Sequence, residues 1–156
     1  MADEQENKSK EIALTRVFDF PREVVWEAWT DPDGISNWWG PNGFTTTTKS
    51  MDLRPGGKWI HVMHGPDGVD YPNFTEYIEV DPPNRLVYRN SGGEGELADV
   101  SFISTVEFRD IDGKTELSLT TVMDSAEMLE LVVKKYGAIE GLENTFSRLA
   151  DYLDRK

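Results

Sequence analysis

Two stretches of the chain alternate hydrophobic and polar residues with the period of half-buried β-strands. The first, Ile12 to Phe20, places Ile12, Leu14, Phe18 and Phe20 on one face, together with Arg16. The second extends from Phe44 to Met123 and is divided by turns rich in Gly, Pro, Asn and Asp. Consecutive strands joined by short turns pair antiparallel, so this stretch predicts a meander of about six strands.

The expected strands of the meander follow from the positions of these turns. They are Phe44 to Leu53, Lys58 to His64, Tyr71 to Val80, Arg85 to Asn90, Val100 to Arg109 and Lys114 to Met123. We expect a loose acidic loop at Gly92 to Gly95 and a hairpin turn at Asp110 to Gly113.

Helical periodicity appears between the first strand and the meander. Pro21 suits the first turn of a helix in which Val25, Trp26 and Trp29 share one stripe, and that helix should end by Pro32. A second helical turn is expected around Trp38 and Trp39, ended by Gly40 and Pro41.

The chain closes with a longer helical pattern from Ser125 to Arg155. Ser125 is the predicted N-cap, and Gly137 and Gly141 should loosen or break the helix. An apolar stripe follows at positions i, i+4, i+7 and i+11, formed by Leu142, Phe146, Leu149 and Leu153. Such a face must be buried, and the concave side of the sheet is the expected partner.

Composition narrows the possible classes of protein. A chain of 156 residues is about one domain, and we expect a disordered tail over residues 1–11 and a single domain over residues 12–156. The absence of Cys excludes disulfides, a thiol nucleophile and Cys-ligated metal sites. The net charge of −13 disfavours binding to nucleic acids and to anionic membranes. The acidity serves either solubility or a docking surface.

No hydrophobic targeting segment is visible near the N-terminus, so we expect a cytoplasmic protein. The sequence also lacks the spacing of an EF-hand, a phosphate-binding loop or a nucleophile elbow. His61 and His64 lie three residues apart on one predicted strand, so they should project to opposite faces and cannot share a metal ion. We therefore expect no metal site, no cofactor and no catalytic residue.

Several spaced motifs resemble a known family. They are Thr15-Arg16-Val17-Phe18, Val25 to Pro32, Trp38-Trp39-Gly40-Pro41, Asp52 to Trp59, Asp67-Gly68, Glu79 to Pro83 and Arg85-Leu86-Val87. Together with the order of elements, they resemble the domain named after the activator of the heat-shock-protein-90 ATPase, a branch of the SRPBCC (START and pollen-allergen) superfamily. The resemblance implies an α+β helix-grip fold. Its curved antiparallel sheet of about six or seven strands wraps a long C-terminal helix, and two short helices follow the first strand.

The resemblance also implies a function, because members of this superfamily mostly bind hydrophobic ligands between the sheet and the helix. The main hypothesis is therefore non-catalytic binding of a small apolar molecule, in a stress-related setting. One alternative is a co-chaperone-like protein that docks on a heat-shock ATPase through its acidic sheet surface. Another is a polyketide-cyclase-like enzyme that uses His61 with a carboxylate such as Glu76 as general acid and base.

The expected ligand pocket combines aromatic residues, one histidine and the apolar stripe of the last helix. Its residues are Trp38, Trp39, Trp59, His61, Met63, Tyr77, Leu142 and Phe146. His61 is the best polar candidate in such a pocket, although a buried histidine satisfied by a neighbour is the commoner situation. The fourth strand of the family usually carries a Gly before the aromatic residue and the Glu, and this chain has Asn73-Phe74-Thr75-Glu76-Tyr77 instead. Larger side chains there should narrow the cavity or change its contents.

Overall fold

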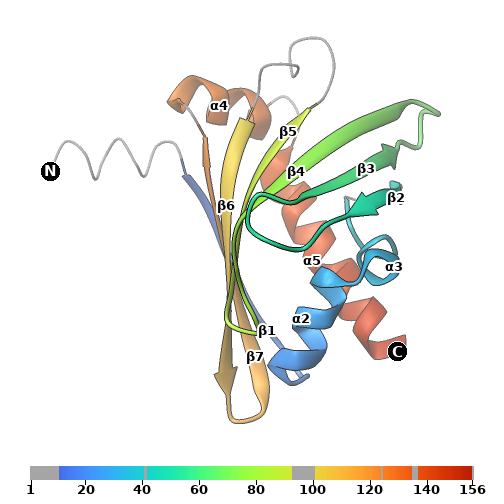
Figure 1. The fold of residues 1–156 in the computed structure, drawn as a ribbon. Helices are drawn as coiled ribbons and strands as arrows, with labels where there is room; N and C mark the ends of the chain where they lie inside the picture. The colour runs from blue at the N-terminus through green and yellow to red at the C-terminus, as the bar shows by residue number, and fades with distance from the viewer. Residues whose placement is uncertain (1–10, 41, 93–100, 124, 135–136, 156) are drawn as a thin grey trace, which may run out of the picture.

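Seven antiparallel strands form one curved sheet, and helix α5 lies on its concave side (Figure 1). This computed structural model describes residues 11–40, 42–92, 101–123, 125–134 and 137–155. The strand order is β1-β7-β6-β5-β4-β3-β2, so β1 and β2 are the two edges of the sheet. The α+β helix-grip fold that the sequence predicts is therefore confirmed.

The strands agree closely with the alternation of hydrophobic and polar residues. Their bounds are β1 Glu11–Phe18, β2 Thr45–Met51, β3 Lys58–His64, β4 Asp70–Asp81, β5 Arg85–Gly92, β6 Ser101–Ile111 and β7 Lys114–Met123. The predicted hairpin between β6 and β7 is present, and Asp112 and Gly113 form its turn with positive φ angles of 52° and 84°. The predicted loop Gly92 to Gly95 lies largely outside the described residues, as do Val100 and residues 1–10 of the predicted tail, whereas Glu11 belongs to β1.

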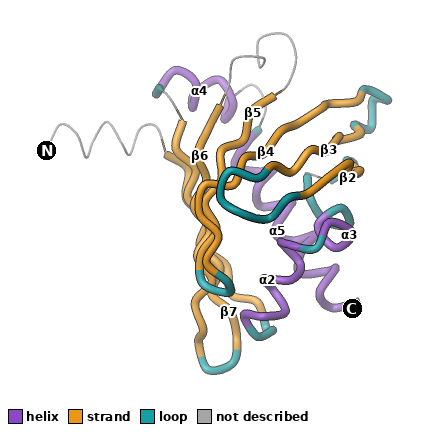
Figure 2. The backbone as a smooth tube through the Cα atoms, viewed as in Figure 1, coloured by secondary structure: helices purple, strands orange, loops and turns teal. Residues whose placement is uncertain are grey.

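Two short helices follow β1, and Figure 2 shows them beside α5. They are α2 (Arg22–Thr30) and α3 (Pro32–Ile35), and α2 also packs against β6 and β7. Helix α3 begins earlier than the turn predicted around Trp38 and Trp39, because the Asp31 carboxylate caps it and Pro32 occupies its first position. Hydrogen bonds from the Trp38 and Trp39 amides to the Ile35 carbonyl oxygen continue the turn. Of the two residues predicted to end it, Pro41 lies outside the described residues.

The C-terminal helical region is divided into α4 (Ala126–Lys134) and α5 (Ala138–Arg155). The Ser125 hydroxyl accepts a hydrogen bond from the Met128 amide at 3.1 Å, which confirms the predicted N-cap. Gly137 has a φ of 62° and separates the two helices, as predicted. The predicted break at Gly141 is wrong, because Gly141 lies within α5 and its amide bonds to the Gly137 carbonyl oxygen. Packing of α5 outweighs the cost of about 1 kcal/mol that a helical Gly carries.

The core lies between the sheet and the helices. Phe146, Leu149 and Leu153 of α5 are buried in it and Leu142 is half-buried, so the predicted apolar stripe is confirmed. The Phe146 ring meets the edge of Phe18 on β1, with 6.1 Å between the ring centroids. None of the helices in the described part of the chain is long and apolar enough to cross a membrane.

Candidate functional site

The residues predicted to form a ligand pocket gather in the interior of the fold. Trp38, Trp59, His61, Tyr77 and Phe146 are buried, and the other three, Trp39, Met63 and Leu142, are half-buried. Three of the eight, Trp39, Trp59 and Tyr77, line one internal void. The other residues of its wall are Trp29, Ile35, Thr75, Leu86 and Tyr88.

This void has a volume of only about 10 Å³, which is close to the space one water molecule needs. Aromatic rings fill most of the surrounding space. The Trp39 ring meets Trp59 with 5.1 Å between centroids, Trp29 with 5.7 Å and Trp38 with 5.8 Å, each edge to face. A ligand would enter only if these rings moved apart, so the ligand role of the eight residues stays a prediction.

His61 points into this interior, whereas His64 lies on the opposite face of β3, as the alternation of the strand predicts. Only 1% of His61 is exposed. Burial lowers the pKa of His61 to about 4, because the charged imidazolium would lose its hydration. Its ring is therefore neutral near pH 7. The site has no described group of three His, Cys, Asp or Glu side chains that could hold a metal ion.

Glu76 lies on the other side of the sheet from His61. Its neighbours along β4, Thr75 and Tyr77, are buried, and Glu76 itself is exposed opposite Arg89 and Lys58 on the adjacent strands. Because successive side chains of a strand alternate between faces, the sheet separates the Glu76 carboxylate from His61. The hypothesis of an acid–base pair made of His61 and Glu76 is therefore wrong.

A larger space lies elsewhere, where helix α4 crosses the beginning of β1. This groove has a volume of about 520 Å³. Its lining residues are Glu11, Ile12 and Ala13 of β1, Ala126, Leu129, Glu130, Val133 and Lys134 of α4, and Ile139 of α5. We call it the α4 groove. It lies between the edge strand β1, α4 and the first turn of α5, and it shares no residue with the predicted pocket.

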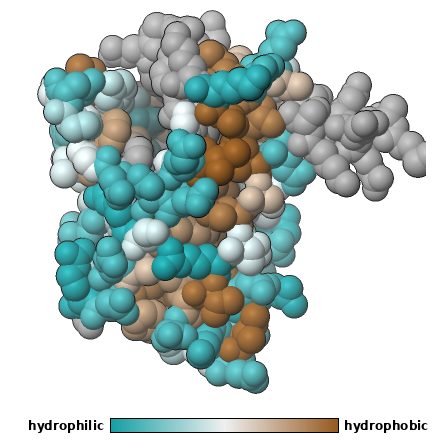
Figure 3. All heavy atoms as spheres, turned by 180° about the vertical axis from the view of Figure 1, so that it is seen from behind, coloured by the Kyte–Doolittle hydropathy of each residue, from teal (hydrophilic) through white to brown (hydrophobic). Residues whose placement is uncertain are grey.

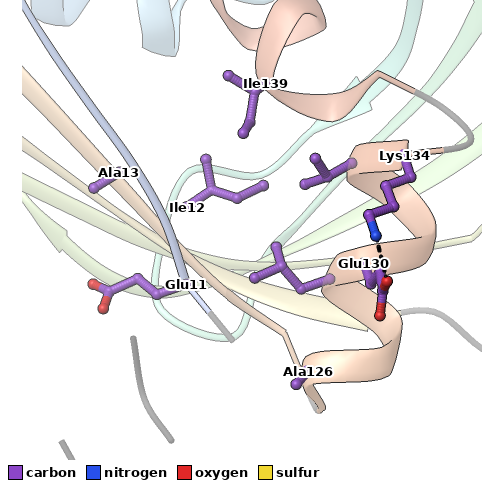
Figure 4. A pocket seen from close by; sticks show the side chains of 9 residues that line it. Glu11, Ile12, Ala13, Ala126, Glu130, Lys134 and Ile139 are labelled. Carbon is purple, nitrogen blue, oxygen red and sulfur yellow. Dashed lines mark hydrogen bonds and ion pairs between the residues drawn. The ribbon is translucent and has the colours of Figure 1, made fainter. Parts of the chain in front are cut away.

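The interior of the α4 groove is apolar and its charges lie at the margin. The close-up shows the side chains of Ile12 and Ile139 directed toward one another across the space, while Glu11 points away (Figure 4). On the outer side of α4, Lys134 Nζ donates to Glu130 Oε1 at 2.6 Å. This hydrogen bond lowers the pKa of Glu130. Seen from behind, the molecule displays hydrophobic side chains open to solvent among hydrophilic ones (Figure 3), and 44% of Ile139 is exposed.

Several features of the sequence pattern belong to the α4 groove. Leu129 and Val133 lie within the helical pattern predicted from Ser125 to Arg155, Ile12 begins the first strand, and Gly137 marks the helix break. What the pattern did not reveal is that α4 lies against the start of β1, which is more than 110 residues away in the chain. The break at Gly137 is the feature that leaves α4 and α5 as two separate walls.

Comparisons with known proteins identify the family and the fold. The sequence profile described as "Activator of Hsp90 ATPase homolog 1-like protein" matches residues 19–154. Among solved structures, a protein from Arthrobacter aurescens is 21% identical with a TM-score of 0.88, over 96% of this chain and 88% of its own. A protein from Mycobacterium smegmatis is 27% identical with a TM-score of 0.82, over 94% of this chain and 91% of its own.

A third structure, of a protein from Nitrosomonas europaea, is 21% identical with a TM-score of 0.82, over 96% of this chain and 97% of its own. A search among curated protein sequences finds no significant match. At these identities the structural relatives establish the shared fold, and the family profile establishes membership.

Proposed function

This chain belongs to the family of Activator of Hsp90 ATPase homolog 1-like proteins, and from this premise we propose that it binds a small, largely apolar molecule in the α4 groove. The family lies in the SRPBCC superfamily, whose fold commonly binds ligands. The observation that carries the proposal is the groove itself. Its volume of about 520 Å³ falls in the range of about 300–1,000 Å³ that small-molecule sites occupy.

The walls of the α4 groove support an apolar ligand. Ile12, Leu129, Val133 and Ile139 come from three separate elements and offer branched aliphatic surface to one space. Binding there would remove this surface from water, which contributes about 0.8 kcal/mol for each buried methylene of the ligand. The interior void, by contrast, has room for about one water molecule.

The first experiment asks what the purified protein already carries. Native mass spectrometry and extraction into organic solvent would identify a co-purified molecule and its chemical class. The second experiment measures the displacement of a fluorescent apolar probe, anilinonaphthalene sulfonate, by octanol, decanol and dodecanol. Two additional methylenes should tighten binding by roughly tenfold if the chain enters the α4 groove.

A matched pair of variants locates the binding site. Ile139 lies at the groove and Ile78 lies on β4, outside it, and 44% of each residue is exposed. We expect Ile139→Ser to weaken decanol binding by about fivefold, since roughly 1 kcal/mol of apolar contact is lost. Ile78→Ser should leave the affinity unchanged. Equal affinities for all three proteins would show that the ligand does not occupy the groove.

The co-chaperone role through the outer face of the sheet and the stress-related setting stay predictions. Titration of the purified protein against a bacterial heat-shock ATPase tests the co-chaperone role, because a co-chaperone would change the rate of ATP hydrolysis. No change at high molar excess would remove this alternative.

A further inference from the structure

Three polar side chains form a line of hydrogen bonds across strands β2, β3 and β4. Thr47 Oγ1 lies 2.8 Å from His64 Nε2, and His64 Nδ1 lies 2.7 Å from Asp70 Oδ1. A carboxylate only accepts hydrogen bonds, so in neutral His64 the proton resides on Nδ1 and is donated to Asp70. Nε2 is then the acceptor, and the Thr47 hydroxyl donates to it. A hydroxyl, an imidazole and a carboxylate connected in this order constitute the arrangement that activates a nucleophile.

The pairing of the strands brings these residues together. His64 of β3 lies opposite Asp70 of β4 and opposite Thr45 of β2, and Thr47 is two residues further along β2 on the same face. All three side chains are open to solvent, with 38% of the His64 side chain and 65% of the Asp70 side chain exposed. They lie on β2 to β4, whereas the α4 groove involves β1 at the other edge of the sheet (Figure 1). This inference is therefore independent of the proposed ligand site.

We propose that Thr47, His64 and Asp70 form an acyl-transfer site, in which Thr47 accepts the acyl group of an activated ester or thioester. Thr47 Oγ1 attacks the carbonyl carbon and its proton passes to His64 Nε2. The bond from that carbon to the leaving group then breaks, and the leaving alkoxide or thiolate takes the proton from Nε2. Asp70 holds the imidazole by its Nδ1–H and stabilises the imidazolium. A water molecule then passes a proton to His64 Nε2 and its oxygen attacks the carbonyl carbon of the threonyl ester. The bond from that carbon to Thr47 Oγ1 breaks, the carboxylic acid leaves, and Oγ1 takes the proton back from Nε2.

Two features around Thr47 would assist acyl transfer. Strand β2 is an edge of the sheet, and backbone N–H groups at a sheet edge are candidate donors to the developing oxyanion. Val62 of β3 lies opposite Thr47, and Pro72 of β4 lies opposite Val62. This apolar row beside the hydroxyl favours a short acyl chain over a charged one.

The histidine content of the chain makes the proposal easy to test. The sequence contains two His residues, and His61 is buried, so a histidine-dependent reaction at the surface depends on His64. We would measure hydrolysis of p-nitrophenyl acetate and p-nitrophenyl butyrate by the unmodified protein and by Thr47→Val, His64→Gln and Asp70→Asn. Thr45→Val is the matched control, because Thr45 lies on the same face of β2 and beside His64.

We expect the unmodified protein to exceed an equal concentration of 4-methylimidazole, and Thr45→Val to equal the unmodified protein. Thr47→Val and His64→Gln should each lose about tenfold or more of the rate. Asp70→Asn should also reduce it, since the imidazole loses the carboxylate that orients it. Rapid acid quenching followed by mass spectrometry should place the acetyl group on Thr47.

Two results would overturn the proposal. One is a Thr47→Val rate equal to that of the unmodified protein, which would mean that His64 reacts alone. The other is a rate no greater than that of free 4-methylimidazole, with no acyl group on Thr47. Circular dichroism of each variant distinguishes loss of activity from loss of folding.

Discussion

The imidazole ring of His61 stacks on the indole ring of Trp59, with 3.7 Å between the ring centroids and 16° between the ring planes. Neither ring nitrogen of His61 has a hydrogen-bond partner of good geometry in the described part of the protein, and the nearby Trp59 backbone offsets only part of the cost of burial. The ring therefore packs as a neutral aromatic group, and desolvation lowers the pKa of His61 from 6.5 to about 4. This arrangement links the stability of the fold to pH.

The free energy of unfolding should decrease as the pH falls from about 6.5 toward 4. In this window the unfolded chain protonates His61 and the folded chain does not, so protons favour unfolding. We expect His61 to account for a loss of about 2 kcal/mol between pH 7 and pH 5. Urea unfolding at the two pH values measures this difference.

His61→Phe is the control for this pH dependence, because it keeps an aromatic ring on Trp59 and removes the titrating group. The variant should lose less stability between pH 7 and pH 5 than the unmodified protein, by about 2 kcal/mol. The same loss in both proteins would show that other groups cause the pH dependence.

Thr75 and Thr115 are both buried threonines, but their hydroxyls differ in bonding. Thr75 Oγ1 lines the internal void and has no partner among the described residues, whereas Thr115 Oγ1 donates to the Phe20 carbonyl oxygen at 2.7 Å. Thr75→Val should leave the free energy of unfolding unchanged or raise it by up to about 1 kcal/mol. Thr115→Val should lower it by about 1–2 kcal/mol, since the carbonyl loses its donor. Similar losses in the two variants would mean that the Thr75 hydroxyl is bonded.

Gly57 should tolerate no side chain, for a reason of space. A Cβ atom at Gly57 would lie 2.0 Å from the Asp52 carbonyl oxygen, whereas a Cβ at Gly68 would meet nothing within 4 Å. Gly68 has a φ of 82°, so Gly68→Ala carries only backbone strain of about 1–2 kcal/mol. Gly57→Ala should destabilise the fold by more than Gly68→Ala in a thermal unfolding experiment. Equal midpoints for the two variants would contradict this prediction.

Backbone hydrogen bonds hold the motif Pro55-Gly56-Gly57-Lys58 against β4. The Gly57 carbonyl oxygen accepts from the Tyr77 amide at 2.9 Å, and the Gly56 amide donates to the Tyr77 carbonyl oxygen at 2.8 Å. The turn between β2 and β3 is thereby attached to β4 beside the buried Tyr77 ring. The motif therefore forms a closely packed turn.

Local sequence patterns predicted the structure correctly wherever one segment determines its own conformation. The bounds of β3 and β7, the Ser125 cap, the turn at Asp112 and Gly113, and the opposite directions of His61 and His64 all follow from alternation, capping and turn chemistry. Gly141 shows the limit of this approach, because the packing of α5 keeps the helix intact there. Propensity at one residue is weaker than the burial of a whole helix face.

Contacts between distant segments required the tertiary structure. The sequence by itself determined the family, the antiparallel sheet, the apolar stripe of α5 and the separation of His61 from His64, because each depends on residue type and spacing along the chain. Only the tertiary structure decided that aromatic rings fill the interior, that an open groove lies between Ile12 and Ile139, and that Thr47 meets His64 and Asp70. These depend on how strands and helices far apart in sequence pack, which periodicity does not encode.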